Sequence, residues 1–113
     1  MSGITTHVLD TSRGRPAKDV PVLLEFLGED GWREIGRGET DGDGRLRTVI
    51  APGEKLAAGT YRVTFDTASY FQECGVEGFY PMVIVHFVVR DAAGHYHVPL
   101  LLSPYGYSTY RGS

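Results

Sequence analysis

Short apolar runs, each closed by a turn that contains glycine, recur along the whole chain. Runs of this length are typical of β-strands, and Gly and Asp in the turns let the chain reverse between them. We expect strands over residues 4–9, 20–27, 32–39, 45–49, 59–66, 82–90, 95–103 and 107–111. Residues 68–74, followed by Gly75, are expected to form one short helix. The pattern predicts an all-β fold in which antiparallel sheets pack as a sandwich.

The period of two along a strand assigns side chains to faces. In the first strand His7 shares a face with Thr5, and in the strand over 95–103 His97 shares a face with His95, opposite Tyr96. Strict alternation over residues 32–39 separates two sets, Trp32, Glu34 and Gly36 against Arg33, Ile35 and Arg37.

The size and charge of the chain restrict its class. The 113 residues are 42% hydrophobic and 22% charged, which fits one globular domain over residues 1–113. The net charge is −3 and the Lys and Arg residues are dispersed, so the sequence predicts no basic patch that could bind nucleic acid. Cys74 is the single cysteine, and neither a signal segment nor an apolar run long enough to span a bilayer is present. We expect a cytoplasmic protein that binds neither nucleic acid nor membrane.

The last nineteen residues, 95–113, are unusually rich in side chains that favour packing or chemistry. They hold two histidines, four tyrosines and an arginine around a run of leucines, whereas chain ends are ordinarily polar and variable. This composition predicts that the tail lines a site or an interface. Tyr105 and Tyr107 are expected to pack across strands or at a subunit interface, whereas Tyr110, next to Arg111, is a better candidate for touching a ligand.

His7, Arg45 and His97 are the polar residues on expected strands or strand ends that could carry chemistry. Histidine exchanges protons near neutrality, although a lone strand histidine is more often structural. His95, His97 and His7 could in principle bind zinc, but no carboxylate or cysteine clusters with them, so we favour a metal-free site. No serine lies in a Gly-x-Ser-x-Gly turn, and therefore activated water is the expected nucleophile of any hydrolysis.

Three segments carry a family resemblance that spans nearly the whole chain. They are His7-Val-Leu-Asp10 with Gly14-Arg-Pro-Ala17, Thr40-Asp-Gly-Asp-Gly-Arg45, and the tail from His95-Tyr-His to Tyr110-Arg-Gly-Ser113. With them the sequence resembles the transthyretin-like family of 5-hydroxyisourate hydrolases, relatives of the thyroid-hormone carrier transthyretin. The closing Tyr-Arg-Gly-Ser is specific for the enzyme branch.

The resemblance implies an enzyme with a defined fold, assembly and reaction. The fold would be a two-sheet, eight-stranded sandwich, and the protein a homotetramer, a dimer of dimers with active sites at the dimer–dimer interface. The reaction would be ring-opening hydrolysis of 5-hydroxyisourate to 2-oxo-4-hydroxy-4-carboxy-5-ureidoimidazoline in urate degradation, without cofactor or metal. The implied catalytic residues are His7, Arg45 and His97; the implied substrate-binding residues are His7, Arg45, Tyr110, Arg111 and Ser113.

A carrier is the competing class, because the hormone-transporting relatives bind aromatic small molecules in a central channel. Catalysed decay of 5-hydroxyisourate would distinguish an enzyme from such a carrier.

Overall fold

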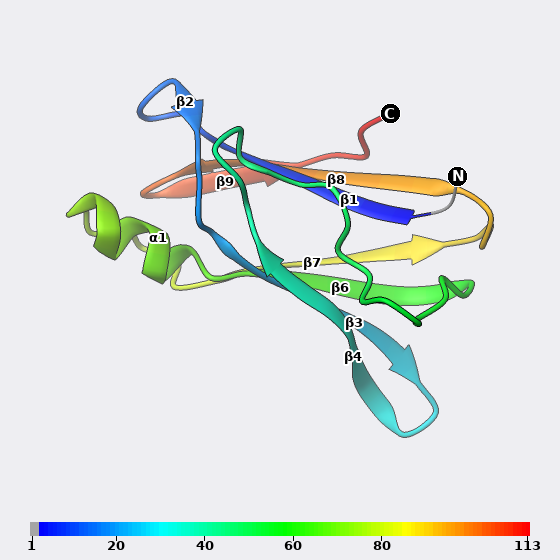
Figure 1. Cartoon of the computed structure of the whole chain (residues 1–113). Helices are drawn as coiled ribbons and strands as arrows, with labels where there is room; N and C mark the ends of the chain where they lie inside the picture. Colours follow the sequence, from blue (N-terminus) through cyan, green and yellow to red (C-terminus); the bar gives the residue numbers. More distant parts are fainter. Residues whose placement is uncertain (1–2) are drawn as a thin grey trace.

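The computed structural model describes residues 3–113, which form two β-sheets packed face to face and one short helix (Figure 1). One sheet has the order β2-β1-β8-β9, with β5 also paired to β1, and the other has the order β4-β3-β6-β7. The elements are β1 (Gly3–Asp10), β2 (Arg15–Pro16), β3 (Pro21–Gly28), β4 (Gly31–Glu39), β5 (Arg45–Leu46), β6 (Gly59–Phe65), α1 (Thr67–Cys74), β7 (Val83–Val89), β8 (His95–Ser103) and β9 (Gly106–Thr109).

The two sheets enclose one core, to which each strand contributes alternate side chains. Along β1 the burial pattern alternates strictly, so that Thr5 and His7 point away from the core. Along β8, Tyr96 is buried whereas His97 is half-buried and His95 is exposed. The predicted faces of both strands and the two-sheet sandwich are therefore confirmed. The largest fully buried side chains are Tyr61, Phe65, Ile4, Leu24, Leu100, Leu102, Val8, Val20, Val49, Val63, Val83 and Val89.

One strand pair departs from the expected antiparallel arrangement. β1 and β8 run parallel, with Thr5 opposite His97 and His7 opposite Pro99. Parallel neighbours need a long connection, and here the whole second sheet and α1 lie between the two strands in the chain. This pairing places the strand that contains His7 next to the strand that contains His97.

Strand β5 is shorter than the expected 45–49. Only Arg45 and Leu46 pair with β1, and the next residues cross from one sheet to the other. The Val49 amide donates to the Ile4 carbonyl (3.3 Å), and the Ala51 amide donates to the Ile35 carbonyl of β4 (3.0 Å). Strand β5 therefore ends where the following backbone begins to make hydrogen bonds to both sheets in turn.

Strand β4 carries a β-bulge, which makes the strict alternation expected over residues 32–39 wrong. Leu24 of β3 pairs with Gly36 and Glu25 pairs with Glu34, so Ile35 is an extra residue on β4. Ile35 and Gly36 are consequently both buried.

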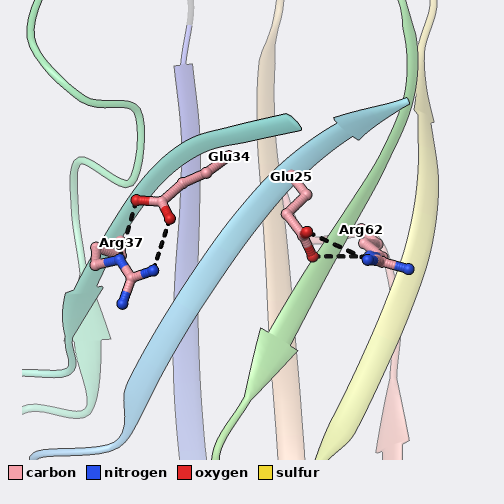
Figure 2. Close-up of polar contacts among 4 residues, drawn as sticks. All are labelled: Glu25, Glu34, Arg37 and Arg62. Atoms are coloured by element: carbon pink, nitrogen blue, oxygen red, sulfur yellow. Dashed lines mark hydrogen bonds and ion pairs between the residues drawn. The ribbon is translucent and has the colours of Figure 1, made fainter. Parts of the chain in front are cut away.

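The bulge also changes which charged side chains meet on the outward face of the second sheet. Residues three apart on a regular strand point to opposite sides, yet Arg37 donates from Nε and Nη2 to the Glu34 carboxylate (3.0 and 2.6 Å). Figure 2 shows this pair near a second one, in which Arg62 of β6 donates to Glu25 of β3 (2.7 and 3.2 Å).

Helix α1 begins one residue before the predicted 68–74 and ends where predicted. The Asp66 carboxylate accepts a hydrogen bond from the Ser69 amide (3.0 Å) at its start, and Gly75 adopts the left-handed conformation after its end. No helix within residues 3–113 has the length and apolar character needed to cross a membrane.

Strand β9 spans 106–109, not the expected 107–111, because its partner contains Pro99. Proline has no N–H to donate to the ladder, and the Thr109 hydroxyl donates instead to the Pro99 carbonyl (2.7 Å). Pairing resumes at Gly112, whose amide donates to the His97 carbonyl (2.9 Å). The tail therefore returns to the sheet beside the histidine.

Candidate functional site

His7 and Arg45 lie side by side on the outward face of the first sheet. They are directly opposite in the antiparallel pairing of β1 and β5, so both side chains project from the same face. His7 Nε2 donates to the Asp43 carbonyl (2.9 Å). Because a carbonyl oxygen only accepts, this bond places the hydrogen of a neutral His7 on Nε2 and leaves Nδ1 as the acceptor.

The turn over residues 40–44 holds Arg45 beside His7. The Asp41 carboxylate accepts from the amides of Asp43 (2.8 Å) and Arg45 (3.0 Å), and these contacts help to lower the pKa of Asp41. Gly44 has φ +75°, and a Cβ there would collide with the Val8 carbonyl. The Asp-Gly-Asp-Gly sequence therefore forms a tight turn, and Arg45 follows directly after it.

His97 reaches the same face from β8. It is opposite Thr5 in the parallel pairing with β1, and its Nδ1 lies 2.7 Å from the Thr5 hydroxyl oxygen. Thr5 and His7 are two residues apart on one strand, a rise of about 6.6 Å. The structure therefore brings His7, Arg45 and His97 together from three strands.

The surroundings of His97 favour its neutral form. Burial lowers the pKa of His97 below its ordinary value of 6.5, and the positive charges of His7, Arg45 and His95 lower it further; a hydrogen bond with the backbone of Thr5 acts in the opposite direction. A neutral imidazole near neutral pH has a lone pair with which to accept a proton, and a fixed guanidinium nearby can stabilise negative charge.

The tail packs against His97. A Cβ on Gly112 would collide with the His97 ring, so only glycine permits this approach. Tyr110 and Ser113 are exposed on either side of it. The side chain of Arg111 points toward Tyr96: its guanidinium carbon lies 4.9 Å from the centroid of the Tyr96 ring. Since Tyr96 points to the opposite face from His97, the side chain of Arg111 is not brought to the histidines.

A cavity of about 520 Å³ opens next to the candidate site and was not anticipated from the sequence. Thr5 and His95 border it on the strand side, and the segment over 47–56 closes it. The sequence signal for Thr5 was its position two residues before His7, on the same face. The lining residues are Gly3, Ile4, Thr5, Arg47, Thr48, Val49, Ile50, Ala51, Pro52, Gly53, Glu54, Lys55, Leu56 and His95.

Metal ligands are not grouped in the part of the chain that the structure describes. No cluster of three or more His, Cys, Asp and Glu side chains within residues 3–113 could hold an ion.

The chain matches the model of a known family over residues 4–112, and that family is described as HIUase/Transthyretin. The chain belongs to the HIUase/Transthyretin family. Within this family it is 46% identical over 110 residues to a 5-hydroxyisourate hydrolase of Salmonella dublin, covering 97% of this chain and 80% of the relative.

Solved structures of two kinds of family member resemble this fold. The Klebsiella pneumoniae 5-hydroxyisourate hydrolase has a TM-score of 0.85 and 36% identity, with all of both chains covered. Transthyretin from Sparus aurata has a TM-score of 0.90 and 33% identity, covering 99% of this chain and 97% of that one. Because a hydrolase and a transthyretin share the fold, function has to be argued from the site.

Proposed function

We propose that this member of the HIUase/Transthyretin family is a 5-hydroxyisourate hydrolase that opens the cyclic amide ring of its substrate in urate degradation. The observation that carries the proposal is the meeting of His7, Arg45 and His97 on one outward face, next to the tail. The relatives named as hydrolases support the same reaction.

In the proposed reaction water is the nucleophile. A neutral histidine of the pair His7 and His97 removes a proton from water as a new bond forms between the water oxygen and the ring carbonyl carbon. Arg45 stabilises the negative charge that develops on the carbonyl oxygen, because its planar donors match an oxyanion. The C–N bond of the ring then breaks, the protonated histidine gives its proton to the leaving nitrogen, and the carboxylic acid that forms releases its remaining proton to water and becomes a carboxylate.

The tail would close the site and bind the substrate. Tyr110 and Ser113 are exposed next to Gly112, which itself lies against the His97 ring. We propose that their hydroxyl groups hydrogen-bond to the ring substituents of the substrate. For Arg111, its position over Tyr96 favours anchoring of the tail over direct contact with the substrate.

We further propose a cytoplasmic homotetramer built as a dimer of dimers. β7 and β9 are edge strands, and edge strands with apolar side chains tend to be covered. Ile84 and Val88 of β7 are 40% and 48% exposed, and Tyr107 of β9 is 43% exposed. The unpaired Cys74 suits a reducing compartment.

The assay follows the decay of freshly generated 5-hydroxyisourate by its absorbance. The protein should accelerate decay well above the spontaneous rate, and a chelator should leave that rate unchanged because the proposed steps use only side chains and water. Absence of acceleration would favour a channel carrier for aromatic molecules, and loss of activity with the chelator would favour a zinc hydrolase.

A further inference from the structure

The Thr5 hydroxyl lies between two imidazoles on the outward face. Its oxygen is 2.7 Å from His97 Nδ1 and 3.4 Å from His95 Nε2. Thr5 is half-buried on β1, whose pairing with β8 fixes its position opposite His97. A rigid strand residue with a short bond to one ring nitrogen is well placed to determine which nitrogen of His97 carries hydrogen.

We propose that Thr5 is a positioning residue that accepts a hydrogen bond from His97 Nδ1–H and so keeps His97 Nε2 free to accept a proton from water. Thr5 donates its own hydrogen toward His95 Nε2. This inference rests on the proposed function, and it assigns the role of general base to His97.

The direction of the short bond follows from what His97 must do during turnover. When Nε2 takes a proton, both ring nitrogens become donors, and Thr5 must then accept from Nδ1. If Thr5 accepts before the reaction as well, nothing has to reorient when the proton arrives. The opposite direction would put the hydrogen of neutral His97 on Nε2, where it could not act as a base.

His7 is held in the complementary way. Its Nε2 donates to the Asp43 carbonyl, so its acceptor nitrogen is Nδ1. Within residues 3–113, His97 Nε2 makes no side-chain hydrogen bond, whereas Nδ1 is engaged by Thr5. The two histidines therefore present different nitrogens, and only in His97 is the tautomer set by a side chain that can be replaced.

Replacing Thr5 should also move the pH dependence of His97. The groups that face His97 are Thr5 and His7 of β1, Arg45 of β5, and His95 of its own strand, while the tail presents Gly112. The charged members of this set oppose protonation of His97, whereas a hydroxyl that accepts from Nδ1–H favours it, because a cationic ring is the stronger donor. Loss of that bond should shift the acid limb of kcat/KM to lower pH.

The test combines three variants with nuclear magnetic resonance of the ¹⁵N-labelled histidine rings. Thr5→Val removes the hydroxyl at nearly constant shape, Thr5→Ser keeps the hydroxyl, and Thr5→Ala serves if the valine variant does not fold. Thr6→Val is the matched control, because Thr6 lies on the inward face and its buried hydroxyl oxygen has no hydrogen-bond partner among residues 3–113.

In the native protein and in Thr5→Ser, His97 should carry hydrogen on Nδ1, and in Thr5→Val this preference should be lost. We expect kcat to fall roughly 10- to 100-fold in Thr5→Val with little change in KM, as when other partners that orient histidines are removed. Thr6→Val should keep native kcat.

The ring measurement needs no substrate, so it remains readable if the proposed function fails. An Nδ1–H tautomer that persists in Thr5→Val, or a native protein with hydrogen on Nε2, would overturn the inference. A native tautomer pattern in a protein that does not accelerate 5-hydroxyisourate decay would refute the proposed function and leave the positioning of His97 by Thr5 standing.

Discussion

The two histidines of the site differ in how the fold holds them, although both project from one face. A backbone carbonyl, from Asp43, accepts from His7, whereas a side-chain hydroxyl, from Thr5, contacts His97. Burial and neighbouring positive charge lower the pKa of His97. The differences favour distinct roles for residues that look equivalent in the sequence.

Arg45 tests the electrostatic part of the proposal at the scale of one residue. Arg45→Gln should lower kcat/KM by about 10²–10³-fold, the usual effect of removing a donor to a developing oxyanion. Circular dichroism and assembly should not change, since the structural contact of Arg45 in the turn is made by its backbone amide. Arg13→Gln, an exposed change in the turn between β1 and β2, is the control. Native activity in Arg45→Gln would exclude the proposed stabilisation of the carbonyl oxygen by Arg45.

The acid limb of the pH profile tests the protonation state of His97. Because the folded pKa of His97 lies below 6.5, the neutral base persists to lower pH than in a free histidine. The midpoint of the acid limb of kcat/KM should therefore lie below 6.5. The lowered pKa of His97 also links the stability of the fold to pH. Its contribution to the free energy of unfolding is fully present above the pKa of histidine in the unfolded chain, and it is lost as the pH falls through the pKa in the folded protein. A midpoint above 6.5 would be inconsistent with this environment.

At the scale of elements, the turn over 40–44 links folding to the site. Gly44→Ala should destabilise the protein by about 1–3 kcal/mol, because it forces a side chain into a left-handed conformation and against the Val8 carbonyl. Gly42→Ala is a matched control in the same turn, since a Cβ at Gly42 meets nothing within 4 Å. Urea denaturation measures both. Equal stability of the two variants would show that the turn does not depend on Gly44.

The elements also show which features could be read from the sequence. Alternation located β1 and β8 and gave the correct outward faces of His7 and His97, because one face of each strand is buried. The turn at residues 40–44 and the glycine after α1 were predictable for another reason, because both depend on local backbone chemistry.

Features set by distant contacts could not be predicted. The bulge at Ile35 depends on the pairing of β4 with β3, and the early end of β5 depends on bonds to the other sheet. The parallel pairing that puts Thr5 next to His97 joins segments about ninety residues apart. The orientation of Arg111 toward Tyr96 likewise depends on a distant contact, because the tail pairs again with β8 at Gly112.

At the scale of the whole molecule, the proposed homotetramer is tested by the mass of the protein in solution. Light scattering coupled to size exclusion should give about four times the chain mass of 12.4 kDa. Val88→Lys should shift the protein to smaller species, because Val88 is 48% exposed on the edge strand β7. Leu27→Lys, at a residue 43% exposed on β3, should leave the mass unchanged. A native protein that is monomeric would contradict the proposed assembly.

The central claim is that His7 and His97 act as one hydrolytic unit, and a double-mutant cycle on 5-hydroxyisourate hydrolysis tests it most directly. The values of kcat/KM are compared for the native protein, His7→Asn, His97→Asn and the double variant. When two groups act together, the losses of activity on replacing each are not additive. The kcat/KM of the double variant should therefore be about as low as that of the less active single variant. Single losses that multiply in the double variant, or single variants that keep native activity, would contradict the claim.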